Sequence, residues 1–67
     1  MAVKIRTVDN SFVKEIDADG ITVGALLKKL GLLVEEYVVV KNNQVVTEDD
    51  IVRDGDEIVL YPVVSGG

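Results

Sequence analysis

One stretch of this 67-residue chain has the periodicity of a helix, and the segments on both sides of it have the patterns of strands. Within that stretch, apolar residues recur at the spacing of a single helix face. These residues are Val23, Leu26, Leu27 and Leu30. Thr22 is a suitable N-cap before them, and Gly31 suits the position just past the helix end. The sequence therefore predicts one main helix, and the rest of the fold must be built from β structure.

Strands are predicted wherever apolar and polar residues alternate or β-branched residues accumulate. The predicted strands are residues 3–8, 12–16, 37–41, 44–46 and 57–64. Turn-forming residues join the first pair into a hairpin, and Asn42 and Asn43, which tolerate positive φ, join the second pair. Residues 47–50 are predicted to cap a single helical turn. Pro62 indicates that the far end of the last strand leaves the ladder or lies at an edge.

The resulting order, β-β-α-β-β-β, restricts the topology. Two strands joined through a helix in so short a chain require a right-handed crossover, with the first and last strands central and parallel. This is the β-grasp arrangement, an α+β fold in which a mixed sheet of four to five strands packs on one main helix. We expect residues 1–64 to form this domain and residues 65–67 to form a flexible tail.

Composition argues against several classes of function. The chain has no Cys and no His, so it lacks a thiolate nucleophile, an imidazole base and the usual ligands for zinc. A net charge of −5 disfavours binding to nucleic acid, and no apolar run is long enough to span a membrane. We expect a soluble cytoplasmic protein that is a monomer when free and is not itself an enzyme.

The sequence finishes with Ser65-Gly66-Gly67, directly after a β-rich apolar run. Two consecutive glycines are a poor choice for a purely structural terminus, because ordering them costs more entropy than ordering any other residue. Without Cβ atoms they can pass through a narrow channel, and residues 63–67 could reach on the order of 15 Å when extended. We predict that Gly66 allows this threading and that the Gly67 carboxylate is presented to the active site of a partner.

The segment 54–67 resembles the closing segment of the ubiquitin-like sulfur carriers. That family includes the ThiS protein of thiamine synthesis, the small MoaD subunit of molybdopterin synthase, and archaeal and eukaryotic modifier relatives. The resemblance rests on the D-G-D turn at residues 54–56, the apolar strand after it and the final Gly-Gly. The helix start at Thr22, the turn at residues 42–44 and the chain length suit the same family.

This resemblance implies a function that depends on other proteins. An ATP-dependent E1-like adenylyltransferase would adenylate the Gly67 carboxylate, and a sulfur donor enzyme would convert the acyl-adenylate to a thiocarboxylate. A sulfur-accepting synthase would then receive the sulfur. The carrier would bind no cofactor, since ATP is used by the activating enzyme. The short chain favours a ThiS-like protein, whereas Pro62 and Ser65 favour MoaD-like and archaeal relatives. Thiamine synthesis, molybdenum cofactor synthesis and tRNA thiolation therefore all stay open.

An apolar surface for the partner is the second expected feature. In the last strand Ile58 and Leu60 alternate with Val59 and Tyr61, and both sets are apolar although a solvated face ought to be polar. By comparison with the ubiquitin-type pattern we expect an outward partner-binding set beside the tail, consisting of Val39, Val59, Tyr61, Val63 and Val64. Asp56, together with Glu57, is expected to pair with Arg side chains of the activating enzyme. The alternative for the apolar residues is that β-branched and aromatic side chains simply suit strands.

Two other functions use the same features. In one, the chain is a ubiquitin-like modifier, conjugated through Gly67 to lysines of target proteins. In the other, it is a β-grasp interaction module without any C-terminal chemistry, so that deleting Gly66 and Gly67 would leave partner binding intact.

Overall fold

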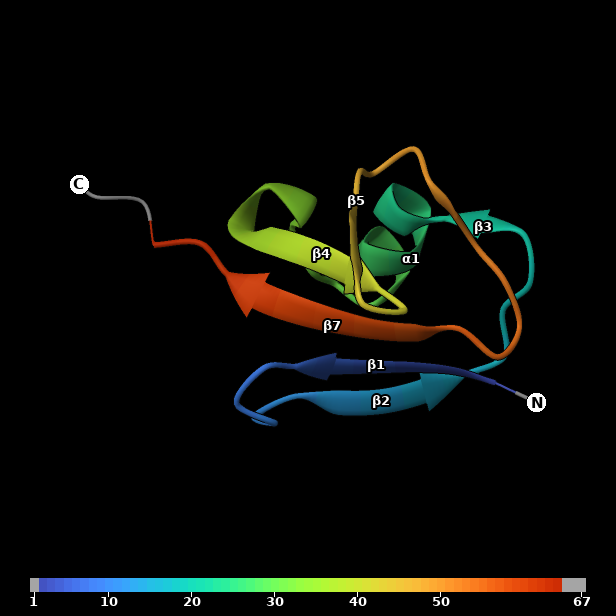
Figure 1. Ribbon diagram of the computed structural model, residues 1–67, viewed down its shortest axis with the longest axis horizontal. Helices are drawn as coiled ribbons and strands as arrows, with labels where there is room; N and C mark the ends of the chain where they lie inside the picture. Colours follow the sequence, from blue (N-terminus) through green and yellow to red (C-terminus); the bar gives the residue numbers. More distant parts are fainter. Residues whose placement is uncertain (1, 65–67) are drawn as a thin grey trace.

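A five-stranded mixed sheet forms the centre of the computed structural model, which describes residues 2–64 (Figure 1). Its strands, in spatial order, are β2 (Val13–Ile16), β1 (Val3–Thr7), β7 (Glu57–Pro62), β4 (Tyr37–Lys41) and β5 (Gln44–Val46). β1 and β7 are parallel neighbours at the centre, and the other neighbouring pairs are antiparallel. The predicted β-grasp topology is therefore confirmed.

Helix α1 (Val23–Lys29) is held at both ends by the residues that the sequence singles out. At its start, the Thr22 hydroxyl oxygen accepts a hydrogen bond from the Ala25 N–H at 3.1 Å. At its end, Gly31 has a φ of 77°, and the N–H groups of Gly31 and Leu32 donate to the Lys28 and Leu27 carbonyls. This is a Schellman motif, and it turns the chain back across the helix.

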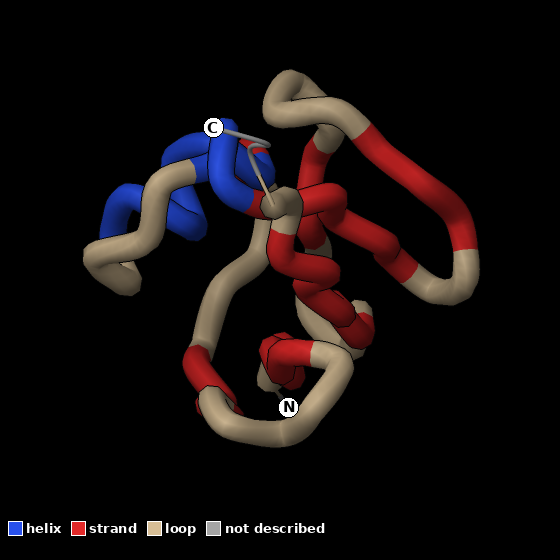
Figure 2. Tube along the Cα trace, turned by 90° about the vertical axis from the view of Figure 1, so that its left-hand side faces the viewer, coloured by secondary structure: helices blue, strands red, loops and turns tan. Residues whose placement is uncertain are grey.

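The core lies between α1 and one face of the sheet, which we call the inner face. The helix contributes its stripe of Val23, Leu26 and Leu27, all fully buried. The sheet contributes Val3, Ile5, Val39, Ile58 and Leu60, and Val52 closes the core from the segment before β7. Figure 2 shows the helical segments gathered on one side of the sheet. The opposite side, the outer face, has no layer over it within residues 2–64 (Figure 2).

Three short elements were not predicted. A 3₁₀ helix, η1 (Val34–Glu36), precedes β4, and β3 (Ile21–Thr22) pairs with β6 (Ile51–Val52) in a separate two-stranded sheet. Each is too short to show a period in the sequence.

The single helical turn expected over residues 47–50 is wrong. The Asp50 carboxylate accepts a hydrogen bond from the Thr47 N–H at 2.7 Å and closes a tight turn there. The carbonyls of Glu48 and Asp50 accept hydrogen bonds from Gly24 and Val23 at the start of α1. Because these carbonyls accept hydrogen bonds from the neighbouring helix, they are not available for the hydrogen bonds of a helical turn within residues 47–50.

The last strand ends earlier than predicted, at Pro62, which lies opposite Tyr37. The parallel ladder with β1 has already ended there, which agrees with Pro62 marking the point where the strand leaves the ladder. The predicted tail, residues 65–67, lies outside the described residues. Within residues 2–64, no helix is both long enough and apolar enough to cross a membrane.

Candidate functional site

The described chain leaves the sheet at the end of β7, beside η1. The N–H of Val63, one residue past the strand, donates a hydrogen bond to the Glu36 carbonyl at 2.8 Å. Val63 is half-exposed, and Val64 is 89% exposed. The chain is therefore tied to the domain at Val63 and enters solvent at Val64. Ser65 follows, and then Gly66, predicted to allow threading, and Gly67, predicted to carry the reactive carboxylate; all three lie outside the described part of the chain.

Apolar side chains lie on the outer face next to this exit. Tyr61 is directly opposite Val38 across the β7–β4 pair, and Val59 is opposite Val40. Tyr61 is 43% exposed, Val38 is similarly exposed, and Val40 and Val59 are half-buried. These four residues, Val38, Val40, Val59 and Tyr61, form what we call the outer patch. A contiguous exposed apolar patch of this kind is typical of protein interfaces.

The same register extends the outer face across all five strands. Arg6 of β1 lies beside Val59, and Val13 of β2 lies beside Arg6. On the other side, Val45 of β5 lies opposite Val40. The resulting row is Val13, Arg6, Val59, Val40 and Val45. One cation therefore stands within an otherwise apolar row, where a partner carboxylate could meet it.

Charged residues mark the limit of the outer patch. Lys4 of β1 lies between Glu15 of β2 and Glu57 of β7, at the end of the sheet away from the tail exit. The outer face is thus apolar at the exit end and charged at the opposite end. A partner with an apolar surface would therefore bind at the end of the outer face where the chain leaves the sheet.

The prediction that Val39 points outward is wrong. Val39 is 3% exposed and lies in the core, opposite Leu60 of β7 and Val46 of β5. The neighbouring residues Val38 and Val40 take the outward positions instead. Alternation alone separates a strand into two sets without saying which set faces the helix, and a shift of one residue exchanges them.

Asp56 lies at the opposite end of β7 from the tail exit. One carboxylate oxygen accepts the Arg53 N–H at 2.8 Å, and the other accepts the Asn42 side-chain amide at 2.9 Å. The hydrogen bond from the Arg53 N–H is the largest cause of a lowered pKa at Asp56. Asn42 in turn accepts the Glu57 N–H. Asp56 therefore closes the turn before β7, and the structure does not bring it together with the outer patch.

Within residues 2–64, no three Asp, Glu, Cys or His side chains lie close enough together to hold a metal ion. The arrangement at the exit consists of an apolar surface, one guanidinium and an anchored strand end. Such an arrangement can bind a protein and direct a chain end toward it.

The family model described as the ThiS family matches residues 3–67. The chain belongs to the ThiS family. It is thus a small protein of the sulfur-carrier, ubiquitin-like kind, and such proteins are generally carriers rather than enzymes. The family also implies interaction with activating enzymes in general.

Solved structures agree with the fold of this ThiS-family chain. The solution structure of the Haloferax volcanii HVO 2177 protein is similar with a TM-score of 0.66 and 25% identity, covering 100% of this chain and 87% of that one. A ubiquitin-like protein from Trypanosoma brucei is similar with a TM-score of 0.57 and 19% identity, covering 90% of each chain. The second likeness shows the shared fold.

Sequence reasoning missed Val38, Val40 and Arg6 in this site. The signal for Arg6 was its place in an alternating strand, where Lys4 and Arg6 must share the face opposite the buried Val3 and Ile5. The two valines required the register of β4 against β7, which the sequence of β4 alone does not contain.

Proposed function

We propose that this chain is a cytoplasmic sulfur carrier whose Gly67 carboxylate is adenylated by an E1-like enzyme and converted to a thiocarboxylate. The observation that carries the proposal is the exit of the chain at Val63 and Val64, beside an exposed apolar patch and just before Gly66-Gly67. Membership of the ThiS family supports it.

The chemistry requires a partner because a carboxylate is a poor acyl donor. In the proposed first step, a Gly67 carboxylate oxygen attacks the α-phosphate of ATP, forming an acyl-adenylate and releasing pyrophosphate. Sulfur released by the donor enzyme at the hydrosulfide level then attacks the acyl carbon, AMP leaves with the electron pair of the broken C–O bond, and loss of the S–H proton gives the thiocarboxylate. Acid, base and phosphate-binding groups would come from the activating enzyme, while this chain supplies binding and orientation.

The outer patch is the proposed docking surface. Tyr61 and Val38 offer adjacent apolar side chains, and Tyr is among the residues enriched at the centres of interfaces. The tie at Val63 leaves residues 63–67 to span the distance to the partner's active site, on the order of 15 Å when extended. Docking on the patch would thereby restrict where Gly67 can reach. Val63 and Val64 would contact the entrance of the partner's channel.

Reconstitution with a cognate E1-like enzyme tests the proposal. With ATP, we expect exchange of labelled pyrophosphate into ATP that depends on this chain and is lost when Gly66 and Gly67 are deleted. With a sulfur donor added, intact mass spectrometry should show the exchange of one oxygen for one sulfur. Absence of both signals, with the deletion variant and the full chain behaving alike, would refute it.

The same experiment separates the sulfur pathway from conjugation. A modifier would also support pyrophosphate exchange, but it would leave Gly-Gly remnants on lysines of other proteins and gain no sulfur. We propose that the acceptor is a synthase of thiamine or molybdenum cofactor synthesis or an enzyme of tRNA thiolation. Offering the thiocarboxylate form to each in turn identifies which one consumes it.

A further inference from the structure

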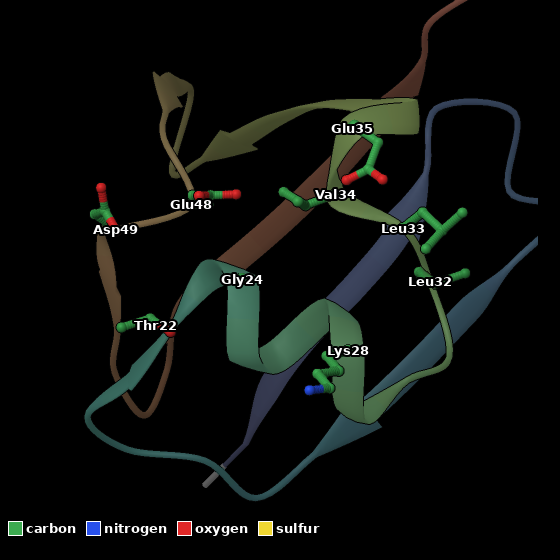
Figure 3. A pocket seen from close by; sticks show the side chains of 9 residues that line it. All are labelled: Thr22, Gly24, Lys28, Leu32, Leu33, Val34, Glu35, Glu48 and Asp49. Carbon is green, nitrogen blue, oxygen red and sulfur yellow. The ribbon is translucent and has the colours of Figure 1, made fainter.

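A hollow of about 460 Å³ lies in the helix layer, between α1, η1 and the turn at residues 47–50 (Figure 3). It is lined on one side by residues 32–35, on the other by Glu48 and Asp49, and along its base by Thr22, Gly24 and Lys28. None of these residues belongs to the outer patch. The hollow is therefore free in a carrier whose outer face is docked.

Backbone contacts hold both walls of this hollow. The Gly24 N–H donates to the Glu48 carbonyl at 2.9 Å, and a Cβ at position 24 would lie 3.4 Å from two atoms of Glu48. The turn at residues 47–50 thus packs closely on the start of α1. On the other side, the Leu32 N–H donates to the Leu27 carbonyl at 2.9 Å and fixes the chain that leads into η1. A hollow whose walls are fixed in this way is preformed, which reduces the entropy lost on binding.

The wall at residues 32–34 is apolar without being fully buried. Leu32 and Val34 are half-buried, and Leu33 between them is 55% exposed. Leu32 and Val34 pack in part against the core, so Leu33 is the apolar side chain that this wall exposes to solvent. This wall can receive an aliphatic group.

The charges around the hollow are mainly negative. Three carboxylates line it, those of Glu35, Glu48 and Asp49, against one ammonium, that of Lys28. In Figure 3 the Glu35 and Glu48 side chains extend toward the hollow from opposite walls. Since the described residues contain no group of acidic side chains placed to hold a metal ion, a bound metal does not fit this arrangement. A cationic group at the end of an aliphatic side chain fits this arrangement, because the aliphatic part can lie on the apolar wall.

We propose that this hollow docks an extended segment of a second protein that carries an Arg or Lys among aliphatic residues. The aliphatic part of that segment lies on Leu33 and Val34, and the cationic group lies between Glu35 and Glu48. The occupant is identified by charge complementarity to a chain of net charge −5.

The proposal is independent of the C-terminal chemistry and is tested on the full-length chain. The probe is the synthetic peptide acetyl-Gly-Val-Leu-Arg-Leu-Val-Gly-amide, titrated into ¹⁵N-labelled protein and followed by NMR. We expect weak saturable binding, with shifts concentrated at the amides of Gly24, Leu33 and Glu48. A second peptide, with citrulline in place of Arg, keeps the shape and removes the charge, and its affinity should fall about fivefold.

Matched variants locate the contact. Glu48→Gln is expected to weaken binding of the Arg peptide and to reduce the difference in affinity between the two peptides, because Glu35 stays in place on the other wall. The fold should survive this change because the Glu48 carbonyl, not its side chain, accepts the Gly24 N–H. Glu15→Gln makes the same chemical change on β2, away from the hollow, and should leave the affinity unaltered.

Three outcomes would overturn the proposal. The first is equal binding of the Arg and citrulline peptides, and the second is a set of shifts that maps to the outer patch instead. The third is self-association, abolished by Glu48→Gln in sedimentation equilibrium, which would make a second copy of the chain the occupant.

Discussion

The inner face of the five-stranded sheet and the exit end of its outer face are both apolar, but they differ in what covers them. On β7, Ile58 and Leu60 face the helix with no exposed area, whereas Tyr61 and Val59 face outward with part of their surface in water. The inner residues bury their surface within the chain and so stabilise the fold. The outer residues gain the same stabilisation only when another protein covers them. One strand therefore contributes to folding with one set of side chains and leaves the other set available to the proposed partner.

The largest expected effect comes from placing a charge on each face at neighbouring positions. Val39→Asp would bury an unpaired carboxylate in the core, at a cost of several kcal/mol, which is comparable to the whole stability of a domain this small. We expect this variant to lose its cooperative thermal transition in circular dichroism. Val38→Asp places the same group in water, and its free energy of unfolding should change by at most about 1 kcal/mol. If Val39→Asp folds and Val38→Asp does not, the two faces are assigned the wrong way round.

A second pair removes apolar surface from each face of β7. Leu60→Ala leaves a cavity in the core and should lower the free energy of unfolding by about 2–5 kcal/mol, measured by urea denaturation. Tyr61→Ala should change it by less than about 1 kcal/mol. In the proposed adenylation assay, Tyr61→Ala should raise the KM for the carrier at least about tenfold with little change in kcat, because a buried interface Tyr contributes on the order of 2 kcal/mol. A Tyr61→Ala variant with wild-type KM would remove the outer patch from the docking surface.

A smaller effect is expected from the helix cap. Thr22→Ala removes the hydroxyl that accepts the Ala25 N–H and should cost about 1 kcal/mol in the free energy of unfolding. Because α1 covers the inner face alone, binding at the outer patch should be unchanged once the variant is fully folded. Thr22→Ser, which keeps the hydroxyl, is the control and should stay close to wild type.

The smallest expected effect is at Asp56, and it depends on pH. A carboxyl group whose pKa is lowered in the folded protein stabilises the fold above its ordinary pKa, and that stabilisation is lost as the pH falls through the lowered value. Asp56→Asn should therefore cost up to about 1 kcal/mol at neutral pH, and the difference from wild type should shrink below the ordinary value of 3.8. Urea denaturation of wild type and Asp56→Asn at pH 7 and at low pH measures the difference in the free energy of unfolding under each condition. A difference that grows on acidification would contradict the hydrogen-bonded carboxylate described here.

Asp9 adds acid sensitivity in the same direction. The N–H and hydroxyl of Ser11 and the hydroxyl of Thr7 lower the pKa of Asp9 to about 2. Wild-type protein should thus lose stability progressively between the ordinary value of 3.8 and about 2. Asp9→Asn should flatten that part of the pH dependence, measured by urea denaturation across the same pH range.

Local patterns were sufficient to predict most of the fold. The helix could be predicted because a stripe of apolar residues, a threonine cap and a C-terminal glycine all agree on the same boundaries. The turn at Asn42 and Asn43 could be predicted because both adopt positive φ, which Asn tolerates. The β3–β6 pair could not, since two-residue strands are defined by the partner they meet rather than by their own sequence.

The candidate site was less predictable because it depends on contacts between distant segments. Val38, Val39 and Val40 are identical in type, so the register against β7 alone decides which of them is buried. Asp56 was expected to pair with an Arg of the activating enzyme. In the structure its oxygens are already bonded within the domain, to Arg53 and Asn42. The tie between Val63 and the Glu36 carbonyl uses backbone atoms and leaves no signature in the side chains.

The parallel pairing of β1 with β7 has a consequence for how this chain folds. The two strands come from opposite ends of the sequence, so the entropy of closing a long loop must be overcome before their contact contributes. Neither hairpin can form the core early, because Ile58 and Leu60 arrive with β7. We therefore expect slow, all-or-none folding. A partly folded chain would have neither the outer patch nor a fixed exit. An activating enzyme that requires both would therefore act only on fully folded chains.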